Sequence, residues 1–178
     1  VLLNAQTNVS GNITANTTWT VTGSPYQITG DVGVSAGITL TIEPGARVQF
    51  VGNYKIQVQG NLIAVGTLSN KIVFDTGSVQ TSIMILFRKT NLSNSKIGNT
   101  SFNGSTNAIQ LAQESEFTND SPKNSGVLVV DSCTFNRSSV QTNGYSTTAS
   151  LSISNSQFVS STIKGVYPRS EPIVIKNA

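Results

Sequence analysis

A short phrase that ends in phenylalanine recurs along this chain of 178 residues, and no other feature limits the fold as much. Successive copies lie 24, 28, 33 and 23 residues apart, at Phe50, Phe74, Phe102, Phe135 and Phe158. A period of roughly 20 to 25 residues with short strands in each unit is typical of solenoids. We therefore predict that each copy belongs to one rung of a solenoid, with these five side chains stacked in an inward column.

Short runs of alternating residues precede the phenylalanines and predict strands. In ITLTI, Leu40 and Ile42 share one face, and Leu62 and Ala64 repeat them 22 residues later. A second series repeats every 22 to 23 residues, at Leu128 and Val130, Leu151 and Ile153, and Ile173 and Ile175. Strong helix formers are scarce. The sequence therefore predicts an all-β fold, a parallel β-helix of about six rungs over residues 25–178.

The two ends of the chain differ from the repeats. Residues 1–24 lack the clean pattern and contain Trp19, so we predict that they form an N-terminal cap over the exposed strand edges. The C-terminal PIVIKNA stops where a phenylalanine strand would follow. We therefore expect a truncated C-terminal end, with this chain as the N-terminal part of a longer solenoid.

A small polar residue stands three positions before several of the phenylalanines, at Asn99, Ser132 and Asn155, and Asn177 continues the series. A tight bend between two strands needs a residue that tolerates the left-handed conformation, as Asn does. Stacked Asn side chains can also bond to one another along such a column. We predict an Asn ladder, although Asn is frequent enough here for chance to be an alternative.

Two predicted features lie on the outside of the solenoid. The polar stretch QESEFTNDSPKNSG, residues 113–126, is a predicted insertion that explains the longest gap. An outward column that is half apolar runs through Thr41, Ile63, Val129, Ser152 and Val174. We expect residues 82–95 to cover this column with Met84, Leu86 or Phe87, because large exposed apolar patches are uncommon.

Residues 24–76 resemble the opening of many secreted, right-handed parallel β-helix proteins of bacterial surfaces, which are pectin-lyase-like. The matching pieces are Gly30 to Val32, Gly37 to Gly45, Val48 to Phe50, Gly60 to Thr67 and Ile72 to Phe74. The resemblance implies a right-handed solenoid and a secreted or cell-surface location. It says little about activity, because such folds carry many functions. Within it, Glu43-Pro44-Gly45 is interpreted as a turn.

The composition argues against several kinds of chemistry. The chain has 24 Ser, 21 Thr and 18 Asn but no His, so the commonest general base and metal ligand is missing. The net charge of +3 comes from scattered residues, which does not favour nucleic-acid binding. No apolar run reaches the length of a membrane span. We predict no cofactor, no metal and no transmembrane segment.

The acidic residues and the single cysteine predict no catalytic site. Glu114, Glu116 and Asp120 cluster beside Lys123 in the predicted insertion, where a solvated loop is favoured over a cation site. Asp131 aligns with Ser154 and Lys176 on neighbouring rungs, which suggests surface pairing. Cys133 has no evident acid or base partner, so a small buried side chain is favoured over a nucleophile.

Eight Asn-x-Ser/Thr sequons occur, at Asn8, Asn12, Asn16, Asn91, Asn99, Asn103, Asn119 and Asn136. Chance would give about 4.5 of them for this composition, so the excess is mild. They are candidate glycosylation sites if the source is eukaryotic, and Asn99 should be unsuitable if it stacks in the ladder.

Three functions are compatible with these observations. The leading hypothesis is a non-catalytic secreted or cell-surface domain, adhesin-like or a structural stalk, whose partner is an extracellular glycan or another surface protein. Its candidate ligand residues are Tyr145, Tyr167 and Arg169, with Tyr54 and Trp19 as further aromatics. The alternatives are the N-terminal part of a polysaccharide lyase or hydrolase, and an ice-binding solenoid. The latter needs a threonine array, but Thr39 and Thr41 align with Asn61 and Ile63.

Overall fold

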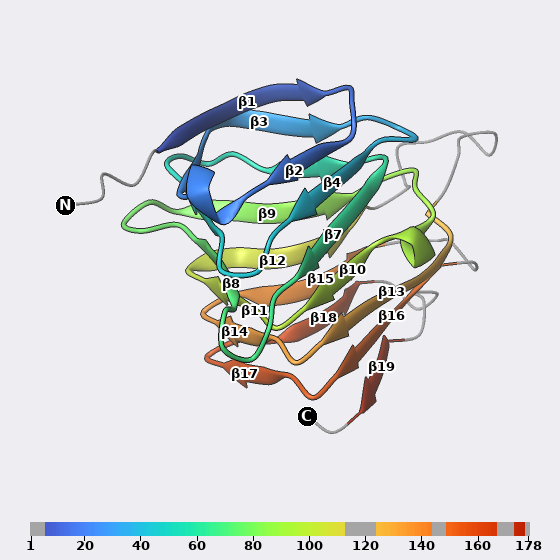
Figure 1. Cartoon of the computed structure of the whole chain (residues 1–178). Helices are drawn as coiled ribbons and strands as arrows, with labels where there is room; N and C mark the ends of the chain where they lie inside the picture. Colours follow the sequence, from blue (N-terminus) through green and yellow to red (C-terminus); the bar gives the residue numbers. More distant parts are fainter. Residues whose placement is uncertain (1–5, 113–123, 144–148, 167–172, 177–178) are drawn as a thin grey trace.

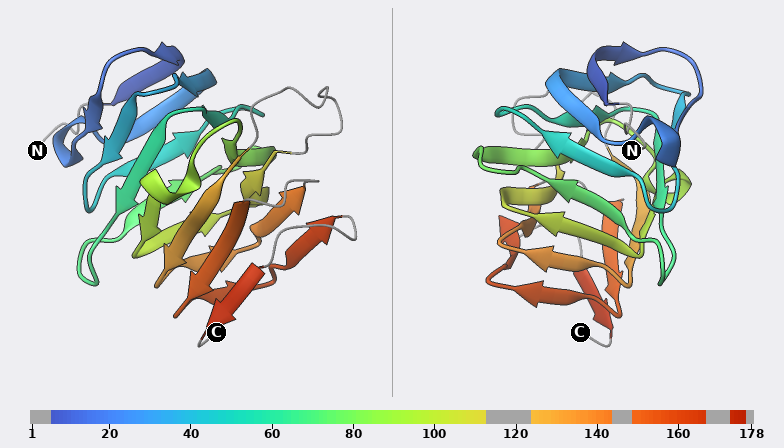
Figure 2. Two further views of the ribbon diagram at one scale, coloured as in Figure 1. Left: turned by 90° about the vertical axis from the view of Figure 1, so that its right-hand side faces the viewer. Right: turned by 60° about the vertical axis from the view of Figure 1, so that its left-hand side comes forward.

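The chain folds into a right-handed parallel β-helix, as the sequence predicts (Figure 1). This architecture is seen in a computed structural model that describes residues 6–112, 124–143, 149–166 and 173–176. Every strand pairing within this described part is parallel. Figure 2 shows the strands of successive rungs stacked from the β1 end to the β19 end.

The strands form three faces around one core. Face 1 is a seven-stranded sheet of β2 (Thr17–Trp19), β4 (Thr39–Ile42), β7 (Asn61–Val65), β10 (Lys96–Gly98), β13 (Gly126–Asp131), β16 (Ala149–Ser154) and β19 (Ile173–Lys176). Face 2 holds β5 (Arg47–Phe50), β8 (Ile72–Asp75), β11 (Thr100–Asn103), β14 (Thr134–Asn136) and β17 (Gln157–Val159). Face 3 holds β6 (Ile56–Val58), β9 (Thr81–Phe87), β12 (Ser105–Leu111), β15 (Ser139–Asn143) and β18 (Ile163–Val166).

Faces 2 and 3 join into one sheet at the N-terminal end. β3 (Tyr26–Val34) is long enough to pair with β5 through its first half and with β6 through its second half. β1 (Thr7–Ile13) lies on β3, and β2 lies on β4. Residues 7–19, which lie within the predicted cap, therefore form a further rung of the solenoid. The end of the cap at residue 24 remains a prediction. Two short 3-10 helices, η1 (Val21–Gly23) and η2 (Leu92–Asn94), lie at corners.

The strand registers on face 1 confirm the predicted repeats. Leu40 and Ile42 stand beside Leu62 and Ala64. The second predicted series also pairs residue by residue, from β13 through β16 to β19. Apart from Ile173 and Ile175 on β19, the last of these strands, the inward side chains of both series are buried. The alternating pattern therefore sets which side of each strand meets the core.

The aromatic column is confirmed for four of its five predicted members. Phe74, Phe102, Phe135 and Phe158 stack with ring centroids 5.1, 5.1 and 4.6 Å apart. The placement of Phe50 in this column is wrong, because β5 pairs with β8 so that Val48 lies beside Phe74. Phe50 is fully buried two residues further along, beside Ile28. Both positions point inward, so alternation alone cannot distinguish them.

The predicted cover over the outward column of face 1 is wrong. Met84 and Phe87 are fully buried on β9 of face 3, so they do not cross to face 1. Val129 and Val174 stay 44% and 42% exposed. The column also includes Lys96 of β10, which pairs between Ile63 and Val129. Lys96 separates Ile63 from Val129, and Ser152 separates Val129 from Val174, so the apolar positions of the column are not adjacent.

The corner between faces 1 and 2 has the predicted left-handed residues. Asn99, Ser132 and Asn155 have φ of 44°, 55° and 48°, and each backbone N–H donates to a carbonyl of the next rung. Among Asn99, Ser132 and Asn155 the side chains do not bond to one another: Ser132 Oγ and Asn155 Nδ2 both donate to Asp131, and the buried Oδ1 of Asn99 has no partner in the described part of the chain. Asn177 lies outside the described residues.

A column of small side chains follows these left-handed residues and was not predicted. Thr100, Cys133 and Ser156 each donate to the carbonyl two residues earlier. Ser156 Oγ also accepts from the backbone N–H of Cys133 on the preceding rung, at 3.1 Å. At the corner between faces 2 and 3, the backbone N–H groups of Ser105 and Ser138 likewise donate to the serine Oγ of the next rung, and Ser161 Oγ donates to the carbonyl of Val159. Ser105, Ser138 and Ser161 follow the left-handed residues Gly104, Arg137 and Ser160. These bonds satisfy backbone groups buried at the corners.

Candidate functional site

The residues predicted to contact a ligand are only partly described. Tyr145, Tyr167 and Arg169 lie outside the described residues, as do Glu114, Glu116, Asp120 and Lys123 of the predicted insertion. Trp19 is buried and stacks on Tyr26 with centroids 4.8 Å apart, so it serves packing. Tyr54 is half-buried and lines a cavity of about 110 Å³ with Asn53, Lys55, Ser82 and Ile83.

The four carboxylates within the described residues all have structural partners. Asp31 pairs with Lys55 at 2.6 Å, and Asp75 pairs with Arg47 at 2.7 Å. The Asp75 bond raises the pKa of the Arg47 guanidinium. Glu43 accepts from the N–H of Val21 at the start of η1, while its own carbonyl closes the predicted turn by accepting from the N–H of Ala46. Each of these three carboxylates is thus bound to a structural partner of its own.

Asp131 lies at the corner between faces 1 and 2 and is held by hydroxyl and amide donors. Its carboxylate accepts from Ser154 Oγ at 2.6 Å, from Asn155 Nδ2 at 2.8 Å and from Ser132 Oγ at 2.9 Å. These bonds, that from Ser154 first, lower the pKa of Asp131. Its strand register with Ser154 and Lys176 is as predicted. Asp131 therefore links β13 to β16 through hydrogen bonds to its ionised form.

Cys133 is buried within the column of hydroxyl side chains. Burial raises the pKa of its thiol to about 12, and a bond from the backbone N–H of Thr100 opposes this only in part. A thiol with so high a pKa holds almost no thiolate near neutral pH, so it is a poor nucleophile. Cys133 is therefore the small buried side chain that the sequence predicts, and it also takes part in the hydrogen bonds of the corner column.

We expect Cys133→Ser to change the free energy of unfolding by less than about 1 kcal/mol, because a hydroxyl suits a position flanked by Thr100 and Ser156. Cys133→Ala should cost about 1–3 kcal/mol, since the Thr100 N–H loses its acceptor. Urea denaturation of both variants measures this difference. Equal losses for serine and alanine would contradict the role of the column.

The pH dependence gives a second readout for Cys133. Its folded pKa of about 12 lies above the ordinary thiol value of 9.0, so the unfolded chain loses this proton first. The wild type should therefore lose stability as pH rises from 9 towards 12, and Cys133→Ser should lose less over the same range.

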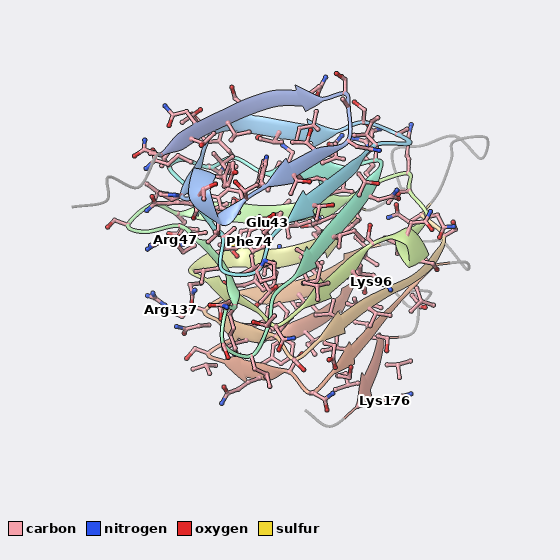
Figure 3. All side chains as sticks on the ribbon, in the orientation of Figure 1. Glu43, Arg47, Phe74, Lys96, Arg137 and Lys176 are labelled. Atoms are coloured by element: carbon pink, nitrogen blue, oxygen red, sulfur yellow. The ribbon has the colours of Figure 1, made fainter. Side chains whose placement is uncertain are left out.

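A groove at the corner between faces 2 and 3 is the best candidate site in the described part of the chain. It has a volume of about 330 Å³. Its lining consists of polar residues and one glycine, namely Gln80, Gly104, Ser105, Thr106, Arg137, Ser139, Ser160 and Lys164. Figure 3 shows Arg137 projecting outward at this corner. No carboxylate lines the groove among the described residues.

The rungs of the helix give the groove its length and position. Gln80 precedes β9, Thr106 lies on β12, Ser139 lies on β15 and Lys164 lies on β18. These are four successive strands of face 3, spaced by about 4.8 Å, so the groove extends about 14 Å along the axis. The left-handed turns at Gly104, Arg137 and Ser160 repeat from rung to rung and place these lining residues in one row.

The groove combines positive charge with hydroxyl groups. Arg137 and Lys164 are exposed, and the two ion pairs found in the described ranges involve other residues. A guanidinium binds a carboxylate or sulfate through paired N–H donors, whereas an ammonium acts as a compact point charge. Ser, Thr and Gln side chains can exchange hydrogen bonds with sugar hydroxyls. The arrangement therefore suits an extended, hydroxyl-rich anion.

A repeated sequence pattern marks this groove, although it is not among the features predicted from the sequence above. A serine follows three of the column phenylalanines at the third position, in FNGS, FNRS and FVSS. That repeated phrase marks the second left-handed corner, whose variable position holds Gly104, Arg137 or Ser160. The repeated phrase does not predict Lys164 as a lining residue, because the position of Lys164 near Arg137 depends on how β18 follows the corner.

Comparisons with known proteins give little information on function. No family model matches the chain, and no solved structure matches it. Protein bark beetle of Drosophila melanogaster is 40% identical over 55 residues, which is 31% of this chain. The match spans about 2% of the length of that relative. In the described part of the chain, no helix is long and apolar enough to cross a bilayer.

Proposed function

We propose that this chain is a non-catalytic, secreted or cell-surface binding module, adhesin-like in character, that contacts acidic glycans through the groove at the corner between faces 2 and 3. The carrying observation is that Arg137 and Lys164 stand among hydroxyl groups on stacked rungs, without a carboxylate beside them among the described residues. A ligand that brings its own carboxylates or sulfates would supply the missing countercharge.

The rigidity of the lining supports this function. Ser105 and Ser138 are buried and bonded to one another, and Ser138 N–H donates to Ser161 Oγ at 2.9 Å. The backbone that presents Arg137 is therefore fixed by its neighbours on both sides. A binding site on a fixed backbone loses less conformational entropy when its ligand binds.

We expect the chain to bind sulfated or uronate-containing oligosaccharides more tightly than neutral ones of equal length, and Arg137→Ala to weaken this binding about tenfold. Arg137→Lys should keep part of the affinity, because the charge stays but the paired donors are lost. Calorimetric titration with both classes of oligosaccharide measures these affinities, which should fall as salt is raised.

Lys96→Ala is the matched control, because Lys96 is an exposed cation on face 1, away from the groove (Figure 3). It should leave the affinity unchanged, whereas Lys164→Ala should lower it. Equal binding of neutral and acidic oligosaccharides would overturn the proposed site. Release of shorter products from any of these glycans would overturn the non-catalytic role.

A further inference from the structure

Among the described residues, the N-terminal rung has one strand edge without a partner strand. Within the described residues, β1 pairs only with β3, and no strand lies on its other side (Figure 2). Its outer edge therefore offers unpaired N–H and C=O groups, to which a strand of another molecule can add. Charged side chains commonly block such edges, but Thr7–Ile13 has none.

Three sequons lie on this rung at intervals of four residues. Asn8 and Asn12 are on β1, Asn16 lies between β1 and β2, and all three are exposed. Asn8 and Asn12 pair in register with Gln27 and Gly33, while the intervening Val9 pairs with inward Ile28. The two asparagines therefore point away from the core.

The local backbone gives these side chains room. The Asn12 side chain lies over Gly33, where a Cβ would collide with it. Gly11 has φ of 82° at an irregularity in the register, which lets β1 continue along β3. Asn16 uses its Oδ1 to accept from the N–H of Thr39 at 2.9 Å, a bond that does not involve the amide nitrogen.

Three of the other sequons lie in less accessible places. Asn99 is at a left-handed corner with its Oδ1 buried, and Asn103 and Asn136 are half-buried neighbours on adjacent rungs. Asn91 is exposed at the start of η2 and, like Asn16, accepts through its Oδ1, here from the N–H of Ser93, so it lies on a different corner but is not excluded. Asn119 is outside the described residues. Exposure and outward direction thus coincide at the three sequons of the first rung.

We propose that Asn8, Asn12 and Asn16 carry N-linked glycans that cover the free edge of β1. The inference rests on the secreted or cell-surface location of the proposed function and on a eukaryotic source. In the transfer, each Nδ2 forms a bond to the anomeric carbon of a lipid-diphosphate-linked oligosaccharide. The carbon–oxygen bond to the diphosphate breaks, the lipid diphosphate leaves, and the amide gives up one proton. The bulky, hydrated products would keep other strands away from the edge.

The test is secretion of the whole chain from eukaryotic cells behind a supplied leader, with glycan occupancy measured by mass spectrometry after enzymatic release. We expect occupancy at Asn8, Asn12 and Asn16, none at Asn99, and a monomer by light scattering. Empty first-rung sequons in the folded product would overturn the assignment.

Edge protection is tested with Ser10→Ala, Thr14→Ala and Thr18→Ala combined, which removes the three sequons at exposed positions and keeps the asparagines. This variant, and the chain made in bacteria without glycans, should self-associate. Ser10→Lys in the bacterial chain should restore the monomer by placing a charge on the edge. Monomeric unglycosylated chains would overturn the protective role.

Glycan binding by the Arg137 groove is measured on the same samples, so failure of the edge proposal is distinguishable from failure of the proposed function.

Discussion

Replacing Phe102 with alanine is expected to lower the free energy of unfolding by about 3–5 kcal/mol. Phe102 is fully buried and stacks on both Phe74 and Phe135, with interplanar angles of 14° and 6°. The variant loses the buried ring, leaves a cavity and removes two aromatic contacts, each worth about 0.5–1.5 kcal/mol beyond area burial. For a domain of this size the melting temperature should fall by roughly 6–20 °C.

Phe50→Ala is the matched control for the aromatic column, because Phe50 is equally buried and has no stacked partner among the described residues. Phe50→Ala should lower the free energy of unfolding less than Phe102→Ala does, by the contribution of the two ring contacts. Phe158→Ala should also cost less, since Phe158 is only partly buried and stacks on Phe135 alone in the described part. Urea denaturation measures all three. If Phe102→Ala loses no more than Phe50→Ala, stacking between rungs contributes nothing to stability.

Gly60→Ala is expected to cost more than about 4 kcal/mol or to prevent folding. Gly60 lies between β6 and β7, and an added Cβ would come nearer than 3.0 Å to the carbonyl oxygens of Ser35 and Ile38. Both are backbone atoms, and the Ile38 oxygen accepts from the N–H of Asn61 at 2.8 Å. Neither can move without breaking the corner of the preceding rung.

Gly37→Ala separates this steric effect from backbone strain. Gly37 has φ of 77°, which disfavours alanine, but no atom lies within 4 Å of an added Cβ. Its cost should be about 1–2 kcal/mol. Circular dichroism melts of both variants check the order. A Gly60→Ala protein as stable as Gly37→Ala would show that the corner can open.

Much of the solenoid follows from local patterns. Leu40 and Ile42, and their counterparts as far as Ile153, are buried because alternation on a strand selects one side for the core. Asn99, Ser132 and Asn155 adopt the left-handed conformation because a tight corner needs residues that tolerate it. These features depend on a residue and its near neighbours, so they can be predicted from one rung at a time.

Other features depend on how rungs meet. Phe50 is outside the aromatic column because the β5–β8 register moves it by two residues, and both alignments bury the same side of the strand. Asn155 Nδ2 donates to Asp131 because the acid of the previous rung lies within reach, a contact that depends on the register between β13 and β16. The placement of Tyr145, Tyr167 and Arg169 stays a prediction, since they lie outside the described residues.

The sequence by itself determined the parallel β-helix, the buried side of each main strand and the position of its first left-handed corner, because these follow from two-residue alternation and from the backbone preferences of single residues. The tertiary structure alone decided the register between β5 and β8 and the groove of Arg137 and Lys164. Residues 27 positions apart become neighbours there only because parallel strands stack about 4.8 Å apart, a relation that no local pattern contains.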